Sequence, residues 1–191
     1  MLTQPEIKEL QRRLSMYDDE SAYKDLFIAF FKPLEQFAFS FIRSKELAEE
    51  IVSDVFIKIW QKRSELEAIG NLKVYLYVSI KNTALTYLLK QHRQVAVSID
   101  ELTIELESFS RNPEEQLLSA EVIRQVNEVI QNLPPRCKII FKFIKEDGLR
   151  YKEVAEILNI SVKTIDNQLS IALRKISKVV SIDLDRVLRN N

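Results

Sequence analysis

The chain has 191 residues, 28 basic and 28 acidic side chains, 46% hydrophobic residues, and only two glycines and five prolines. This length allows one medium-sized or two small domains, the hydrophobic content excludes wholesale disorder, and the shortage of glycine and proline favours long helices. A formal net charge of zero argues against a general nucleic-acid-binding protein.

Cysteine usage and hydropathy predict a soluble, cytoplasmic protein. Cys137 is the single cysteine, so no internal disulfide can form, as is usual in a reducing compartment. The first residues lack the apolar core of a secretion signal. No stretch reaches the roughly 18 uncharged apolar residues of a membrane-spanning helix.

The first half of the sequence predicts three helices. Residues 20–41 carry apolar side chains at helical spacing, and Pro33 predicts either a kink or a division into two helices. Ser44 is expected to cap a second helix over residues 45–62. A third helix is expected over residues 72–92.

The periodicity is lost between Val95 and Pro113, where Ser, Asp and Glu are frequent, which indicates a linker. Its apolar residues predict that the linker is partly docked on another surface. Helical patterns return over residues 114–133, 137–145, 151–158 and 162–180. We therefore expect an all-α fold of two small helical domains, residues 1–95 and 114–191, joined by an acidic linker, residues 96–113.

The charges are unevenly distributed along the chain. Between Asn71 and Arg93 every charged residue is basic, between Ser98 and Glu128 acids dominate, and from Pro134 onwards bases again exceed acids. Two basic blocks separated by an acidic segment predict two anion-binding lobes.

Residues 151–178 have the pattern of a helix-turn-helix. A short helix with the small Ala155 is followed by the turn Asn159-Ile160-Ser161, and Ser161 is expected to cap the second helix. An ordinary helical hairpin with a solvated polar face is the alternative. The expected buried face of the second helix consists of Val162, Ile165, Leu169, Ala172, Leu173 and Ile176.

The polar residues of this second helix are candidate DNA contacts. Donors and acceptors early in such a helix read base edges, whereas later cations contact phosphates. The predicted base readers are Lys163, Thr164, Asn167 and Gln168, and the predicted phosphate contacts are Arg174 and Lys175.

The helix over residues 72–92 combines bases with tyrosines, a composition that suits unstacked single-stranded bases. Tyrosines at helical spacing can equally belong to the core, and Tyr75 with at least one other tyrosine is as well explained in that way. The predicted contacts to single-stranded DNA are Lys73, Tyr77, Lys81, Asn82, Lys90 and Arg93.

The helix over residues 45–62 has a polar face opposite its apolar one, formed by Glu50, Ser53, Asp54 and Lys58. A face that carries carboxylates can pair with a basic protein partner. Simple solvation of this face is the alternative.

Several runs resemble extracytoplasmic-function sigma factors, in the order of that family. Residues 46–60 (ELAEEIVSDVFIKIW) resemble region 2.2, and residues 71–93 resemble regions 2.3 and 2.4. Residues 112–117 (NPEEQL) are similar to the motif that opens the second lobe, and residues 133–176 resemble region four. The Tyr-Leu-Tyr and Lys-Thr-Ile-Asp-Asn runs look closest to sigma factors of Bacteroidetes type.

The resemblance implies a transcription initiation factor. Region 2.2 would bind RNA polymerase core, regions 2.3 and 2.4 would melt and read the downstream promoter box, and region four would read the upstream box. It also implies a membrane-linked anti-sigma protein as inhibitor. The chain departs from the family pattern at Thr86, where Asp is common, and at Leu89 and Ile171, where Arg is common.

The sequence offers no enzyme chemistry. It has no glycine-rich phosphate loop, and His92 is the single histidine. We expect no cofactor, no metal and no small-molecule substrate, and a free chain that is a monomer. The alternatives are a conventional helix-turn-helix regulator that acts without polymerase core, and a helical protein-binding adaptor.

Overall fold

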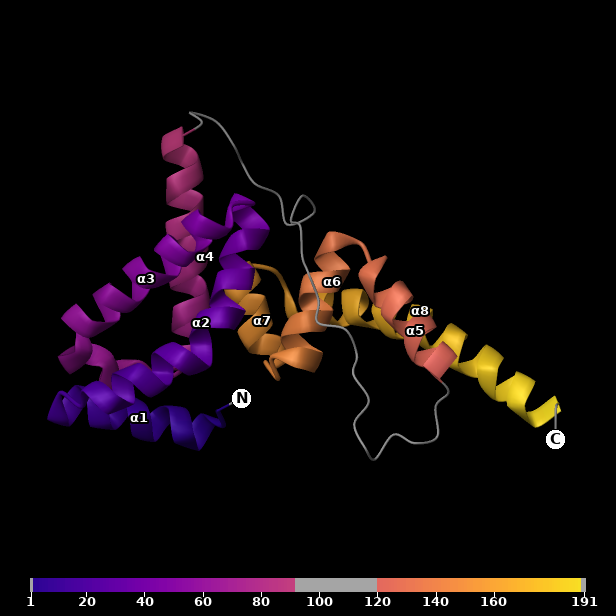
Figure 1. Ribbon diagram of the computed structural model, residues 1–191, viewed down its shortest axis with the longest axis horizontal. Helices are drawn as coiled ribbons and strands as arrows, with labels where there is room; N and C mark the ends of the chain where they lie inside the picture. The colour runs from indigo at the N-terminus through magenta and orange to yellow at the C-terminus, as the bar shows by residue number, and fades with distance from the viewer. Residues whose placement is uncertain (1, 92–119, 190–191) are drawn as a thin grey trace. The chain divides into compact units, whose positions relative to one another are not determined.

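The computed structural model describes residues 2–91 and 120–189, and every regular element in these two ranges is helical (Figure 1). The chain divides into two compact units, Met1–Thr103 and Ile104–Asn191. The predicted all-α fold is therefore confirmed. The predicted linker bounds and its expected docking fall outside the described residues and stay predictions.

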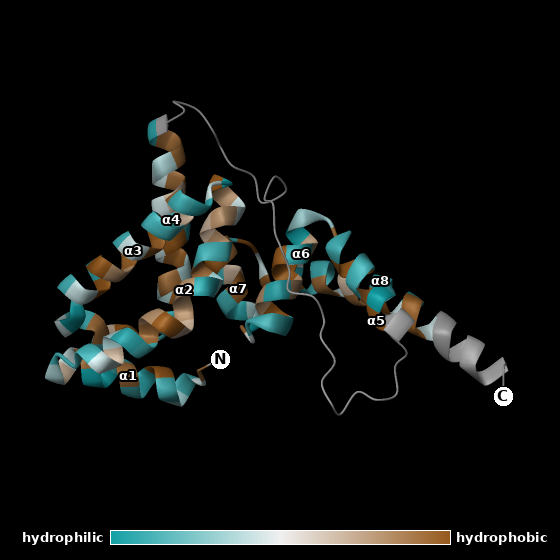
Figure 2. Cartoon of the chain, viewed as in Figure 1, coloured by the Kyte–Doolittle hydropathy of each residue, from teal (hydrophilic) through white to brown (hydrophobic). Residues whose placement is uncertain are grey.

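In the first unit, α2 is the central helix. The unit consists of α1 (Gln4–Tyr17), α2 (Glu20–Ile42), α3 (Lys45–Gln61), the short 3₁₀ helix η1 (Arg63–Ala68) and α4 (Leu72–Gln91). Helix α2 packs against α1, α3 and α4. Figure 2 shows apolar residues along much of α2 and many polar residues on α1.

Side-chain caps fix where these helices begin. The Asp19 carboxylate accepts hydrogen bonds from the amides of Ser21 and Ala22, at 2.9 and 3.1 Å, and starts α2. Ser44 accepts from the Leu47 amide at 3.3 Å, which confirms the predicted cap of α3. Helix α2 continues through Pro33 as one element.

Aromatic contacts join α2 to its two neighbours. Phe27 meets Phe56 of α3 edge to face, with ring centroids 5.0 Å apart, and Phe37 meets Tyr77 of α4 in the same way at 5.2 Å. Each such pair contributes about 0.5–1.5 kcal/mol beyond the burial of its area. These contacts set the rotation of α3 and α4 about their own axes.

Helix α1, which the sequence analysis did not predict, holds the connection between α3 and α4. Buried Gln11 donates from its amide to the carbonyls of Leu66 and Ile69, the latter at 2.8 Å. Ser15 donates to the carbonyl of Ser64 at 3.2 Å. These bonds hold the connection between α3 and α4 against α1.

The second unit is built around its last helix. It contains α5 (Ala120–Gln131), α6 (Pro135–Phe141), a π-helical turn η3 (Lys142–Glu146), α7 (Tyr151–Leu158) and α8 (Val162–Arg189). Helix α8 packs against α5, α6 and α7 and continues beyond the predicted end near Val180. The stretch predicted as one helix over residues 137–145 divides into α6 and η3.

Ion pairs span this π-helical turn. The Lys142 ammonium lies 3.2 Å from the carboxylate of Asp147, which is 2% exposed, and 3.6 Å from that of Glu146. Gly148 follows in the left-handed region, at φ 64°, and forms the turn before α7.

Replacing Gln11 by Leu should lower the free energy of unfolding of the first unit by about 1–3 kcal/mol, because two carbonyls lose their donor. The measurement is urea unfolding followed by fluorescence of Trp60, the single tryptophan. Gln4→Ala is the control: its amide makes an exposed bond to Asn71 at 3.3 Å, and its loss should cost less than about 0.5 kcal/mol. Equal effects of the two variants would contradict this role of Gln11.

Candidate protein and nucleic-acid interfaces

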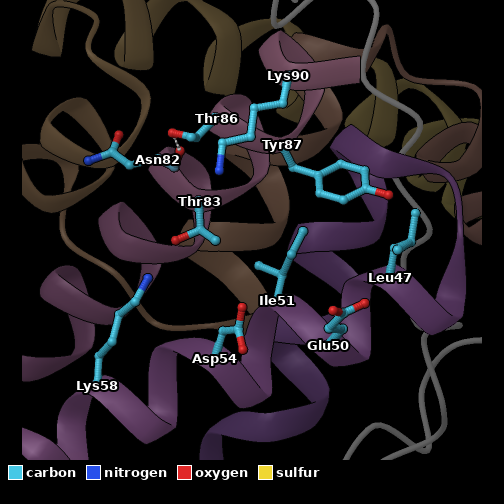
Figure 3. A pocket seen from close by; sticks show the side chains of 10 residues that line it. All are labelled: Leu47, Glu50, Ile51, Asp54, Lys58, Asn82, Thr83, Thr86, Tyr87 and Lys90. Atoms are coloured by element: carbon cyan, nitrogen blue, oxygen red, sulfur yellow. Dashed lines mark hydrogen bonds between the residues drawn. The ribbon is translucent and has the colours of Figure 1, made fainter. Parts of the chain in front are cut away.

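A groove of about 320 Å³ lies between α3 and α4, and side chains from the two helices face each other across it (Figure 3). Helix α3 contributes Leu47, Glu50, Ile51, Asp54 and Lys58, and α4 contributes Asn82, Thr83, Thr86, Tyr87 and Lys90. The groove thus joins residues predicted for polymerase binding to residues predicted for DNA binding.

On the α3 side, three of the four predicted polymerase contacts follow one another at single-turn spacing. Glu50, Asp54 and Lys58 are all exposed, because the opposite face of α3 is buried against the unit's core. None of the three forms a salt bridge with another described residue. Their charges are therefore available to a charged partner.

Ser53, the fourth predicted polymerase contact, differs from these three. Its side chain is half-buried, does not line the groove, and donates to the carbonyl of Glu49 at 2.9 Å. This bond to the preceding turn of its own helix occupies the hydroxyl proton.

On the α4 side, the predicted contacts Asn82 and Lys90 are exposed and two helical turns apart. Thr86 lies between them, and its hydroxyl donates to the carbonyl of Asn82 at 2.8 Å. Thr83 also lines the groove and was missed by the sequence analysis. The spacing of Thr83, Thr86 and Lys90 was the signal that could have found this face.

Two predicted DNA contacts on α4 are buried, which corrects the sequence-based prediction. Tyr77 is 0% exposed with its ring against Phe37, and Lys73 is 7% exposed. Both lie on the face of α4 that packs into the unit, so neither presents its side chain to a base at the surface. Tyr75, which the pattern equally allowed in the core, is exposed.

Lys81 lies one turn after Tyr77 and is half-buried. Partial burial removes water from its ammonium group and lowers the pKa of Lys81. Arg93 and His92 lie outside the described residues.

The second unit contains the predicted helix-turn-helix in α7 and α8. Helix α7 ends at Leu158, and its C-cap residue Asn159 has a φ of 54°, in the left-handed region. Ser161 accepts from the Thr164 amide at 3.0 Å, so the predicted cap of α8 is confirmed. Ala155 is buried, as expected where two helices cross closely.

Helix α8 buries a narrower face than predicted. Ile165, Leu169 and Ala172 are buried, as expected. Val162 and Leu173, which were expected in the core, are 42% and 43% exposed. Both lie at the edge of the buried stripe, where the neighbouring helices do not cover them.

The predicted base readers of α8 fall into two groups. Lys163 and Asn167 are exposed on the face opposite the buried one. Thr164 and Gln168 are half-buried on its flank, and the Thr164 hydroxyl lies 2.8 Å from that of Ser161. The predicted phosphate contacts, Arg174 and Lys175, are both exposed.

Neither unit contains a recognisable metal site among its described residues. No group of three or more potential metal ligands is found there. Cys137 is buried, and its thiol donates to the carbonyl of Gln168 at 3.2 Å. Burial raises the pKa of this thiol. No described helix is long and apolar enough to cross a bilayer.

Both units match models of one protein family. Residues 26–94 match sigma-70 region 2, and residues 123–176 match sigma-70 region 4. The two matches together cover more than half of the chain and follow the order that the sequence resemblance predicts. The chain belongs to the sigma-70 family.

Individual relatives give the branch of the family. The chain is 26% identical over 159 residues to the ECF RNA polymerase sigma-E factor of Escherichia coli K12, covering 79% of this chain and 82% of the relative. The protein of that name from Haemophilus influenzae is 28% identical over 128 residues, 63% of this chain and 67% of the relative. The chain is thus an extracytoplasmic-function sigma factor, which binds RNA polymerase core and directs it to promoters.

Two solved structures share the fold. CnrH, in complex with the cytosolic domain of CnrY, has a TM-score of 0.52 at 17% identity, covering 93% of this chain and 99% of that one. The sigma factor RpoE of Bartonella quintana, in complex with the anti-sigma factor NepR, has a TM-score of 0.51 at 24% identity, covering 84% of this chain and 98% of that one.

Reversing the charge of Asp54 to Lys should weaken binding to polymerase core about tenfold, because the groove then opposes a basic partner surface. Titration of labelled chain with core measures this affinity. Asp25→Lys, an equal reversal at an exposed position on α2, should leave it within about twofold. An unchanged affinity of the Asp54 variant, with intact helicity by circular dichroism, would remove this face from the interface.

Proposed function

We propose that three surfaces of this sigma factor make three separate contacts. The outer face of α3 contacts polymerase core, the C-terminal half of α4 holds the downstream promoter strand, and the N-terminal half of α8 reads the upstream box. The first two of these assignments rest on a single observation, the groove in which α3 and α4 present charged and polar side chains side by side (Figure 3).

The contact with core rests on Glu50, Asp54 and Lys58. Their exposure and one-turn spacing make a continuous charged strip. Such charges on the rim of a protein interface act mainly on association rate and specificity. Ser53 lies beside this strip, and its hydroxyl is hydrogen-bonded to the carbonyl of Glu49.

The contact with the downstream box rests on Asn82 and Lys90, with Tyr87 beside them in the groove. An aromatic ring next to an amide and an ammonium suits an unstacked base and its phosphate. Lys81 borders this surface, and Arg93 extends it by resemblance to the family. Lys73 and Tyr77 act from the core and support the helix.

The contact with the upstream box rests on Lys163 and Asn167, flanked by Thr164 and Gln168. Amide and ammonium donors early in a recognition helix match base edges in the major groove. Arg174 and Lys175 supply phosphate contacts further along α8.

The sequence resemblance and the similar structures support a proposal for the biological setting. One of the two similar structures is of a sigma factor in complex with an anti-sigma factor, and the other is of CnrH in complex with the cytosolic domain of CnrY. We propose a membrane-linked anti-sigma protein as the inhibitor of this chain as well, in the cytoplasm of a bacterium of Bacteroidetes type. No cofactor or enzymatic step belongs to this function.

The free chain should bind promoter DNA weakly and gain specificity only with core, because its net charge is zero. Mobility shifts at fixed salt, with and without core, test this on a promoter selected from a randomised library. Tight specific binding by the free chain would identify a conventional helix-turn-helix regulator instead. If the chain binds core but does not bind DNA under either condition, it is a helical protein-binding adaptor instead.

Replacing Asn167 by Ala should cost about 1–3 kcal/mol at one base pair of the upstream box and flatten the response to changes there. Lys175→Ala should weaken all boxes alike and lower the salt dependence. The measurement is initiation by each variant on single-base changes of the box. A uniform loss with Asn167→Ala would make Asn167 a positioning residue.

A further inference from the structure

An apolar side chain interrupts the polar stripe of α8. Ile171 is 38% exposed, although the buried face of the helix runs through Ile165, Leu169 and Ala172. Ile171 makes no part of that core. Its position along the helix, and not its exposure alone, sets it apart from other surface apolar residues.

Helical spacing places Ile171 among the predicted DNA contacts. It follows Asn167 by one turn and Lys163 by two, and it precedes Arg174 by three residues and Lys178 by seven, so all five residues share one stripe. The four polar members are exposed. The exposed Asp166 lies five residues before Ile171, off this stripe.

We infer that Ile171 is a specificity-determining residue that contacts the 5-methyl group of a thymine in the upstream box. The inference rests on the proposed function of α8. Thymine alone presents a methyl group in the major groove, and an apolar side chain is its matching contact. The surrounding Lys163, Arg174 and Lys178 supply the positive charge that draws this face to duplex DNA.

The geometry also limits where that thymine lies. Four residues of α-helix span about 6 Å, and successive base pairs are about 3.4 Å apart. The thymine should therefore lie within two base pairs of the pair that Asn167 reads. At this base pair Ile171 thus favours thymine, whereas an arginine at the same position would favour guanine.

Replacing single thymines of the selected upstream box by deoxyuridine removes only the methyl group. With core and the native chain, one such replacement should lower initiation about fourfold, the contribution of one buried methyl group. Ile171→Ala should be insensitive to that replacement. Leu173→Ala is the matched control: Leu173 is 43% exposed but two residues away, on another face, so it should keep the full methyl dependence.

Ile171→Arg adds a second arm, in which the preference at that position should move from thymine to guanine. If native chain and Ile171→Ala respond alike to every deoxyuridine, while core-dependent initiation is intact, the inference is overturned and the proposed function stands. If no initiation depends on the chain with core, the proposed function itself fails.

Discussion

The packing of α3 and α4 against α2 is the constraint on which the first interface depends. Phe56 and Tyr77 are seated against aromatic rings of α2, and a helix held in this way cannot rotate about its axis without losing these contacts. Because each residue of a helix turns by about 100°, fixing the buried positions also fixes the outer ones. Asp54 and Asn82 lie in one groove as a consequence of buried aromatic contacts, and not of any bond between them.

In the second unit, too, the buried face of a helix fixes the direction of its exposed side chains. The left-handed Asn159 follows α7, and the Ser161 cap of α8 comes two residues later, so the crossing of the two helices is set locally. Burial of Leu169 then leaves Lys163 and Asn167 facing outward. The proposed contacts require side chains that are held at fixed angles on rigid helices.

Sequence periodicity predicted the helices that carry the sites, because apolar side chains at 3.6-residue spacing and capping residues are local signals. It did not predict α1, although the Thr3 and Glu6 capping box marks its start. Nor could it tell that Tyr77 points inward: bases and tyrosines recur around the whole of α4, and only contact with α2 decides which are buried. The exposure of Leu173 likewise depends on how far the neighbouring helices reach.

We propose that separate faces of α3, α4 and α8 meet polymerase, the downstream strand and the upstream duplex. Site-specific photocrosslinking from Asp54, Asn82 and Asn167 in the initiation complex tests it most directly. We expect a crosslink from Asp54 to a polymerase subunit, and crosslinks from Asn82 and Asn167 to DNA at two separate positions upstream of the start site. Crosslinks from Asp54 to DNA, or from Asn82 to polymerase alone, would contradict it.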